Sequence, residues 1–388
     1  MATYRIAIDG NEANVVDRVG SNTYAYELLV ALEQQLAKQA NWQITVLLTQ
    51  HPCSDMPLER PGWKYVVVRP KQFWTQWALP RFLYQHRSNF DLFFTPGHYA
   101  PRHAPLPYIS AVLDLAFLSH PDSFTLRDRL QLSYWTKYSV KNAKKIITIS
   151  HASKTEIAAT YKIPPENIAV CYPAIGIIQK PTLQEAAKDL KKFAITKPFF
   201  ISLGTIQPRK NLIKLIEAFE SYSRKQQGLA KQTKAKQHNL VLAGKEGWLA
   251  APILKRIAAS PFKELIIVTG FITTKEKWSL LRSATAVVIV GLKEGFGIPA
   301  LEALEANTIP VVANAASLPE VVGESGILVD PHNTLDIADG LWKAATLKAR
   351  EKAVLKKKGR EQKTLFSWKN TAQHVQDLWQ NVLTKKQV

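Results

Sequence analysis

The stretch ATAVVIVGLKEGFGIPALEALE, residues 284–305, joins an apolar segment to a helix-like segment through a glycine turn. The apolar run Ala284–Val290 is short and rich in β-branched residues, which predicts a buried strand. Gly295 and Gly297 allow positive φ angles in the turn, and Pro299 suits the first position of a helix. A strand that leads through a tight turn into a helix is typical of a parallel sheet covered by helices, and therefore of an α/β fold.

The same turn predicts an anion site with an acid on either side. The N–H groups of Gly295 to Ile298 lie at the positive end of the predicted helix, which favours phosphate. Glu294 and Glu302 would repel that anion, so they need other partners. A nucleotide sugar offers sugar hydroxyls, a diphosphate and ribose hydroxyls in sequence, and eight helical residues span about 12 Å, enough to place one acid at each end. The alternative is a glycine turn with a surface glutamate and a helix-capping glutamate.

A second segment, Gly204-Thr-Ile-Gln-Pro-Arg-Lys-Asn211, follows another predicted strand. Arg209 and Lys210 precede a predicted helix at the carboxyl edge of the sheet, where a diphosphate would lie. Arg grips phosphate with two N–H groups and Lys supplies a point charge, so the pair would stabilise a departing diphosphate. Otherwise the two are ordinary surface residues. In the first half of the chain, the loop 9–24 ends with Gly20 at a helix start, which is a further turn compatible with an anion.

Strand-like and helix-like segments alternate along all 388 residues, a length that favours two domains. The pattern predicts two doubly wound, Rossmann-like α/β domains facing an inter-domain cleft, with ligands at the carboxyl ends of the strands. We expect an N-terminal domain over residues 1–180, a proline-containing linker over 181–198 and a C-terminal domain over 199–369. In the second half, the predicted strands are Phe199–Leu203, Asn239–Ala243, Leu265–Thr269, Ala286–Val290 and Ile309–Ala313.

The composition indicates a soluble globular protein, with 46% hydrophobic and 21% charged residues. Apolar runs have strand length rather than the length of a transmembrane helix, and we expect no signal peptide because the N-terminus enters directly into a strand-like run. Cys53 and Cys171 lack metal-ligand spacing and suit a reducing compartment. The chain has no Asp-x-Asp and no His-x-x-x-His pair, so we predict no required metal.

The net charge is +20, with much of the excess in Arg224–Lys236 and Lys352–Lys363. These segments resemble solvated helix faces and a loop rather than a basic stripe interleaved with aromatic residues. We therefore predict no specific nucleic-acid partner, although the charge would attract phosphates or an anionic membrane surface.

The aromatic stretch KQFWTQWALPRFLYQHR, residues 71–87, has two interpretations. Its Trp, Phe and Arg side chains could rest on a membrane interface or contact a lipid-linked acceptor. Alternatively, Trp74, Trp77 and Phe82 pack a helix against the first sheet. Packing is favoured, because an aromatic stripe is more often part of a core.

The segment EGFGIPALE, Glu294 to Glu302, resembles the E-x7-E motif of retaining glycosyltransferases with the GT-B fold, in particular glycosyltransferase family 4. Further segments are similar to the same family and occur in its order: ITISHASKTEI (147–157), LGTIQPRKNLIKLIEAF (203–219), LVLAGKEGW (240–248), PVVANAASLPEVVGESGILVDP (310–331) and FSWKNTA (366–372). The similarity extends over nearly the whole chain and is strongest over residues 199–331.

The resemblance implies a role for each matching position. Glu294 would contact hydroxyls of the transferred sugar and Glu302 the ribose, while Arg209 and Lys210 would neutralise the leaving diphosphate. The expected donor-binding positions also include Gly295, Phe296, Gly297 and Ile298 at the sugar and diphosphate, Gly20 in the first-domain loop, and Thr205 and Gly244. The acceptor would bind mainly to the first domain and the donor to the second, and residues 370–388 would form a helix that crosses back to the first domain.

Two positions depart from the family pattern. Thr205 stands where the family often has Arg, so the positive charge that binds the diphosphate would come from Arg209 and Lys210 alone. Leu113 stands where many relatives have His, and it cannot hydrogen-bond a sugar. His98 is a candidate substitute, and Asp114 is a second candidate for contact with the acceptor or sugar. The alternative for His98 is a loop histidine without a catalytic role.

The sequence therefore predicts a retaining, metal-independent glycosyltransferase of polysaccharide biosynthesis that needs no cofactor. It would move a hexose, with mannose from GDP-mannose or glucose from a UDP donor favoured, to a glycan or lipid-linked acceptor. We expect a cytoplasmic location, with peripheral contact to an anionic membrane at its inner face. The alternatives are a nucleotide-sugar epimerase or hydrolase of the same fold, and a non-catalytic protein that binds sugar nucleotides or polyanions.

Overall fold

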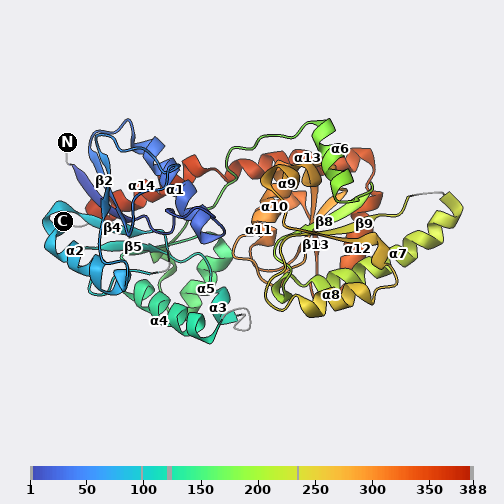
Figure 1. Ribbon diagram of the computed structural model, residues 1–388, viewed down its shortest axis with the longest axis horizontal. Coiled ribbons are helices and arrows are strands. Elements are labelled where there is room, and N and C mark those ends of the chain that lie inside the picture. Colours follow the sequence, from blue (N-terminus) through green and yellow to red (C-terminus); the bar gives the residue numbers. More distant parts are fainter. Residues whose placement is uncertain (1–2, 98, 120–124, 234–235, 385–388) are drawn as a thin grey trace. The chain divides into compact units, whose positions relative to one another are not determined.

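The computed structural model describes residues 3–97, 99–119, 125–233 and 236–384. The chain divides into two compact units, the first formed by residues 1–176 and 366–388 and the second by residues 177–365. Each unit contains a parallel sheet flanked by helices (Figure 1). The predicted α/β fold with two doubly wound domains is therefore confirmed.

The sheet of the first unit has seven parallel strands in the order β3-β2-β1-β4-β5-β6-β7. The strands are β1 (Tyr4–Asp9), β2 (Trp42–Leu48), β3 (Trp63–Val67), β4 (Leu92–Thr95), β5 (Tyr108–Ala111), β6 (Lys145–Thr148) and β7 (Ile168–Val170). The strand order changes direction between β1 and β4. The carboxyl ends of these two strands therefore form the point at which doubly wound sheets bind ligands.

Helices cover both faces of this sheet. They are α1 (Ser21–Leu36), a π-helical turn η1 (Trp74–Ala78), α2 (Leu79–Gln85), α3 (Ala116–Ser119), α4 (Leu126–Asn142), α5 (His151–Tyr161) and α14 (Trp368–Thr384). Phe93 and Phe94 are consecutive in β4 and point to opposite faces, as neighbours in a strand must. Phe93 packs in the cluster that includes Leu79 of α2, whereas the ring of Phe94 lies 5.5 Å from that of Trp379 in α14. α2 and α14 therefore cover opposite faces.

The aromatic stretch 71–87 is only partly buried. Trp74 is buried, and its Nε1 donates to the carbonyl of Val68 at 3.0 Å. Trp77 is 60% exposed, so the expectation that it packs against the sheet is wrong. A π-helical turn is wider than an α-helical turn, and η1 turns Trp77 away from the side on which Trp74 packs. Phe82 is half-buried against the same cluster.

The sheet of the second unit has six parallel strands in the order β10-β9-β8-β11-β12-β13. They are β8 (Phe199–Leu203), β9 (Asn239–Ala243), β10 (Ile266–Gly270), β11 (Ala286–Ile289), β12 (Ile309–Ala313) and β13 (Ile327–Val329). Most of their residues are fully buried, as expected for strands covered on both faces. Here the direction changes between β8 and β11, so the loops after these two strands meet at the second ligand-binding edge.

The helices of the second unit are α6 (Leu183–Lys192), α7 (Leu212–Thr233), α8 (Ala251–Ala258), α9 (Thr274–Ser283), α10 (Ile298–Glu305), α11 (Leu318–Val322), α12 (Thr334–Thr346) and α13 (Ala349–Gln362). Short 3-10 turns in the two units are η2 (Arg87–Asn89), η4 (Pro165–Asn167), η5 (Pro208–Lys210), η6 (Lys263–Leu265), η7 (Gly323–Ser325) and η8 (Lys363–Leu365).

The unit boundaries differ from the expected domain limits. Residues 181–198, expected to be a linker, contain α6, which begins with a capping box between Thr182 and Glu185. Helix α6 packs against α9 and is thus part of the second unit. The chain returns to the first unit at Phe366, where α14 packs against α1.

Candidate functional site

The loops that follow β8 and β11 are tied together by Asn211. This residue has a φ of 56° and directly precedes α7. Its Nδ2 donates to the carbonyl of Val290 at 3.1 Å and to that of Pro331 at 2.8 Å. Asn tolerates a positive φ better than most residues, so this side chain can fix three loops at one edge of the sheet.

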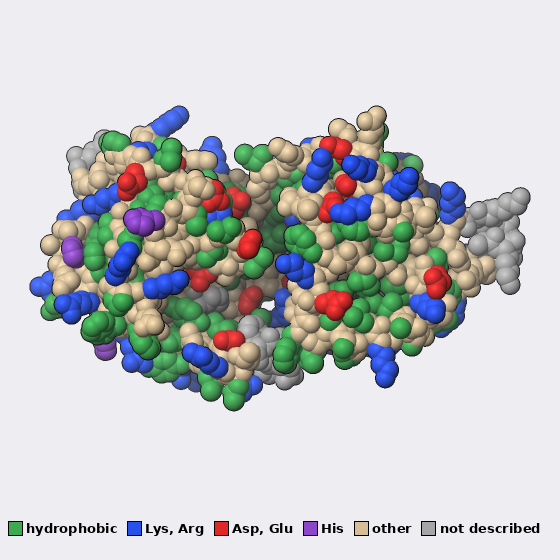
Figure 2. Space-filling view, in the orientation of Figure 1, with side chains coloured by type: hydrophobic (Ala, Val, Ile, Leu, Met, Phe, Trp, Pro, Cys, Tyr) green, Lys and Arg blue, Asp and Glu red, His purple; other side chains and the backbone are tan. Residues whose placement is uncertain are grey.

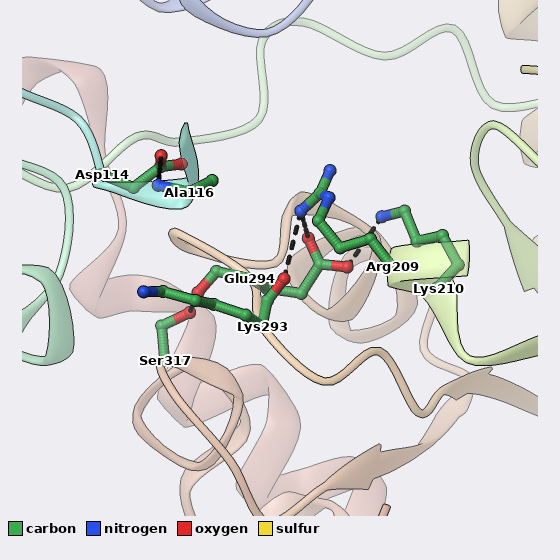
Figure 3. A network of polar contacts seen from close by, with 7 residues as sticks. All are labelled: Asp114, Ala116, Arg209, Lys210, Lys293, Glu294 and Ser317. Carbon is green, nitrogen blue, oxygen red and sulfur yellow. Dashed lines mark hydrogen bonds and ion pairs between the residues drawn. The ribbon is translucent and has the colours of Figure 1, made fainter. Parts of the chain in front are cut away.

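Glu294 lies at the centre of this edge and is 7% exposed. The ammonium of Lys210 donates to its Oε1 at 2.7 Å, and Arg209 Nη1 lies 3.4 Å from its Oε2 (Figure 3). The same Nη1 donates to the carbonyl of Lys293 at 3.1 Å, and the hydroxyl of Ser317 donates to the carbonyl of Glu294 at 2.8 Å. The structure thus brings together the three residues predicted to be catalytic, and it holds both the side chain and the backbone of Glu294.

Two glycines make room for this ion pair. A Cβ at Gly291 would lie 3.0 Å from Oε1 of Glu294, and a Cβ at Gly204 would lie 3.1 Å from Cε of Lys210. Gly204 also has a φ of 130°, which disfavours any residue with a side chain. The ends of β8 and β11 are therefore shaped around Lys210 and Glu294.

The predicted turn before α10 is present. Gly297 occupies the N-cap position with a φ of 95°, and a Cβ there would lie 2.5 Å from Cδ2 of Leu318. Phe296 is buried and Ile298 is 36% exposed. The backbone N–H groups in the first turn of an α-helix have no partner within the helix, so the start of α10 provides the positive end expected from the sequence.

Glu302 lies on the buried side of α10 and is 6% exposed. It forms an ion pair with Lys277 of α9. Burial raises the pKa of the Glu302 carboxyl, while the nearby Lys277 acts in the opposite direction. Glu302 is thus a partly compensated buried acid with one cationic neighbour.

Thr205 and Gly244 lie in the loops after β8 and β9. A Cβ at Gly244 would collide with the carbonyl of Gly204, so its conformation lets the two loops approach each other. The amide of Gly247 donates to the carbonyl of Ile206 at 3.0 Å in the same region. Thr205 is exposed at this loop contact.

The remaining predicted residues belong to the first unit. Gly20 is the N-cap of α1 with a φ of 54°, and a Cβ there would meet open space. Asp114 Oδ1 accepts from the amide of Ala116 at 2.9 Å, and Leu113 is buried. His98 lies outside the described residues.

Two acids at the carboxyl edge of the first sheet were not singled out from the sequence. Asp9 ends β1 and is 9% exposed, and burial raises its pKa to about 7. Glu12 accepts from Asn22 Nδ2 at 2.8 Å and from the Ser21 hydroxyl at 3.3 Å, and burial raises its pKa as well. A Cβ at Gly97, which follows β4, would lie 3.1 Å from Cγ of Glu12. The available signal was the position of Asp9 at the end of a predicted strand.

Sequence reasoning also missed Lys277 and Ser317. Lys277 stands in no recognisable motif, and Ser317 lies in the family-like segment 310–331 but 23 residues from its partner Glu294. In the described part of the chain, no group of three or more His, Cys, Asp or Glu side chains is arranged to hold a metal ion. No helix within the same residues combines the length and apolarity needed to cross a bilayer.

Two family models match the sequence. The model "Glycosyl transferases group 1" matches residues 184–362, and the model "Glycosyltransferase Family 4" matches residues 19–177. Together they extend over both units.

Curated relatives of the chain are named mannosyltransferases. The O-antigen chain mannosyltransferase B of Escherichia coli is 26% identical over 290 residues, which are 72% of this chain and 71% of that protein. The serotype-specific mannosyltransferase WbdA of Escherichia coli is 30% identical over 239 residues, which are 60% of this chain but only 28% of that longer protein.

Solved structures share the fold. A sucrose-phosphate synthase from Thermosynechococcus elongatus matches with a TM-score of 0.71 and 18% identity over 98% of this chain and 100% of its own. HepE from Anabaena, solved in complex with UDP, matches with a TM-score of 0.70 and 15% identity over 98% and 100% of the two chains. At these identities the similarity establishes the two-unit architecture.

Proposed function

The chain belongs to the glycosyl transferases of group 1 and has the GT-B fold, and from this premise we propose that it moves a hexose from a nucleotide-diphosphate sugar to a glycan or lipid-linked acceptor. Transfer would retain the anomeric configuration and require no metal ion. The observation that supports this proposal most directly is the contact of Lys210 and Arg209 with Glu294 at the switch point of the second sheet.

The ion pair suits a nucleotide-diphosphate sugar, in which a charged diphosphate is joined to a neutral hexose. An ammonium group has three donors, so Lys210 can hold Glu294 and a phosphate oxygen together. Arg209 and the first turn of α10 would supply further donors to the diphosphate. The carboxyl oxygens of Glu294 would accept hydrogen bonds from hydroxyls of the hexose. Glu302 would accept from the ribose.

The same groups would act on the leaving diphosphate. Negative charge grows on its bridging oxygen as the glycosidic bond breaks, and fixed cations lower the energy of that state without reorganising. The positions that would touch the donor backbone are Gly295, Phe296, Gly297 and Ile298, with Thr205, Gly244 and Gly20 in neighbouring loops.

We favour GDP-mannose as the donor, because two curated relatives of this chain are named mannosyltransferases. A UDP-hexose is the second candidate, because the similar HepE structure contains UDP. The acceptor would bind to the first unit, where Asp9, Glu12 and Asp114 offer carboxylates to hydroxyl groups. Asp9 and Glu12 flank the switch point of that sheet. We place the reaction at the cytoplasmic face of a membrane that holds lipid-linked acceptors.

The proposal is tested by comparing wild type with Glu294→Gln. GDP-mannose and UDP-glucose are supplied with candidate glycan acceptors, and the product is quantified and its anomeric configuration read by NMR. Removing one preorganised charge contact costs about 3–4 kcal/mol, so we expect kcat to fall by roughly 10²–10³-fold. Glu305→Gln is the matched control, because Glu305 also pairs with a lysine, Lys363, at 2.8 Å, but lies at the end of α10 rather than in the loop before it.

Each of the other outcomes would contradict part of this proposal or indicate another function. Wild-type transfer by Glu294→Gln would contradict the assigned site, and an inverted product would contradict retention. Release of free sugar or of an epimer without transfer would indicate the hydrolase or epimerase alternative. A melting temperature raised by nucleotide sugars, without turnover of any of them, would indicate a binding protein.

A further inference from the structure

The helical segment between β3 and β4 exposes aromatic side chains. Phe73 is 75% exposed, Trp77 60% and Tyr84 63%. Large aromatic rings are usually covered in a folded protein, and three of them within this one short segment remain mostly exposed among the described residues. Phe73 also has a φ of 53°, a conformation that costs energy for a bulky residue.

The opposite side of this segment is packed in the core. Trp74, Leu79 and Leu83 are at most 5% exposed and join the cluster beneath β1 and β4. The segment is thus held firmly with one face inward and the other outward. It does not need a partner to complete its own fold.

Basic side chains lie among the exposed rings. The guanidinium of Arg81 lies 5.9 Å from the ring of Trp77, and that of Arg87 lies 5.3 Å from the ring of Tyr84. Residues 69–87 contain four Lys and Arg and no Asp or Glu. The outward face therefore combines aromatic rings with a positive charge that no acid of the same segment compensates.

Helix α4 continues the same kind of surface. Leu126, Leu130 and Tyr134 are exposed at a helical spacing, and residues 126–145 contain six Lys and Arg but one acid. Ala143, at the end of α4, packs against the cluster that contains α2 and also against the cluster below α4 and α5. The two helices thus cover the same face of the sheet (Figure 1).

The space-filling view agrees with this placement. Hydrophobic and basic side chains lie side by side along the lower left edge of the molecule, in the region of α2 and α4 (Figure 2). By contrast, α1 on the other face of the sheet contains Glu27 and Glu33 and no Lys or Arg. The face that carries α2 and α4 is therefore both basic and aromatic, whereas α1 on the other face is acidic.

We propose that the outward face of Phe73–Arg87, extended by α4, binds the surface of an anionic phospholipid bilayer. Trp and Tyr rings prefer the level of the lipid headgroups, and Lys and Arg gain about 1 kcal/mol each near an anionic surface, which is roughly fivefold in affinity. This inference rests on the membrane location included in the proposed function. Its test measures binding without donor or acceptor, so it can fail while transfer to a water-soluble acceptor remains intact.

The experiment is co-sedimentation of the full chain with vesicles of phosphatidylcholine, with or without phosphatidylglycerol. We expect binding to the anionic vesicles that weakens with salt. Phe73→Asn/Trp77→Ser should reduce it by roughly tenfold or more, since two exposed rings that would insert into the lipid headgroup region are lost. Asn accepts the positive φ at position 73 more readily than Phe, so the variant should keep its melting temperature.

Two control variants separate this surface from the overall charge. Arg81→Gln/Arg87→Gln should weaken binding by roughly tenfold or more, whereas Arg350→Gln/Lys357→Gln removes the same charge from α13 in the second unit and should change little. Phe271→Ser is the aromatic control, because Phe271 is 65% exposed and lies 4.8 Å from Lys245.

Three results would overturn the proposal. The first is equal binding of wild type and Phe73→Asn/Trp77→Ser to anionic vesicles. The second is an equal loss of binding in the control variants. The third is a change of oligomeric state in Phe73→Asn/Trp77→Ser with vesicle binding retained, which would assign the surface to self-association.

Discussion

The two sheets share a strand order around their switch points, but the side chains at the two carboxyl edges differ in charge. In the second unit, Glu294 lies between Arg209 and Lys210, and Glu302 pairs with a lysine. In the first unit, Asp9 and Glu12 have only neutral donors from Asn11, Ser21 and Asn22 among the described residues.

This difference separates the contribution of the fold from that of the loops. The reversal of strand order fixes where a ligand can lie, and the loop residues decide what it can be. An edge with cations suits a diphosphate. An edge with buried acids and neutral donors suits an uncharged ligand rich in hydroxyl groups, because an anion would face uncompensated carboxylates. We therefore interpret the two edges as a donor side and an acceptor side.

Replacing Lys210 would remove the compensation that distinguishes the second edge. Lys210→Met leaves Glu294 buried with Arg209 at 3.4 Å as its remaining ion-pair partner, and breaking a buried ion pair costs about 4 kcal/mol. We expect the free energy of unfolding in urea to fall by about that amount. Adding Glu294→Gln should restore part of it, since the buried charge that only Arg209 then compensates is gone.

The corresponding change in the first unit should be milder. Asn22→Ala removes the 2.8 Å hydrogen bond to Glu12 and should cost about 1.5 kcal/mol. If Lys210→Met were no more destabilising than Asn22→Ala, the electrostatic contrast between the two edges would be absent.

The titration of Asp9 tests whether the edge of the first sheet penalises a charged side chain. Its pKa is raised by burial to about 7, against about 4 in an unfolded chain. The folded state therefore keeps a proton that the unfolded chain has lost, and the free energy of unfolding falls as pH rises from about 4 to about 7. Below about 4 this contribution is fully present, because both states are protonated.

Asp9→Asn should remove this dependence on pH, because an amide side chain does not titrate in this range. Its amide oxygen can still accept the hydrogen bonds from Asn11. Relative to wild type, the variant should gain about 3.6 kcal/mol between pH 4 and pH 8, measured by urea unfolding at each pH. A constant difference across this range would mean that Asp9 titrates normally and that the first edge is not an environment that penalises charge.

Much of this organisation can be predicted from the sequence where the signal is local. The predicted strands Phe199–Leu203, Asn239–Ala243 and Ile309–Ala313 match the observed ones residue for residue, because each is a short and mainly apolar run. The cluster of Arg209, Lys210 and Glu294 was predicted because both loops follow strands that meet at one edge. Parallel topology converts that sequence position into proximity.

Other features depend on contacts that no local pattern encodes. Helix α4 was not predicted, since its buried residues include Thr136 and Ser139 and its mean hydropathy is low. Helix α6 was taken as linker because prolines surround it, although Thr182 and Glu185 form a capping-box pair. Lys277 reaches Glu302 from another helix, and the raised pKa of Asp9 follows from burial by the whole sheet.

The smallest expected effect concerns Glu302, the second acid of the donor side. If it accepts from the ribose, Glu302→Gln should weaken binding of the preferred nucleoside diphosphate by about tenfold, which is about 1.4 kcal/mol. Isothermal titration calorimetry measures this change, with Glu305→Gln as the control on the same helix. The paired Lys277 is partly solvated, so we expect little loss of stability.

A deoxyribose analogue of the same nucleotide separates ribose contact from a general effect of charge at this site. Wild type should lose about as much affinity for the 2′- or 3′-deoxy ligand as Glu302→Gln loses for the parent ligand. For Glu302→Gln itself, removing that hydroxyl should then cost little more, because the two changes delete the same hydrogen bond. If the losses of binding free energy from Glu302→Gln and from the deoxy ligand are fully additive for both deoxy ligands, Glu302 acts on the nucleotide only through its charge. Glu294 would then be the one acid of the second edge that contacts hydroxyl groups of the donor.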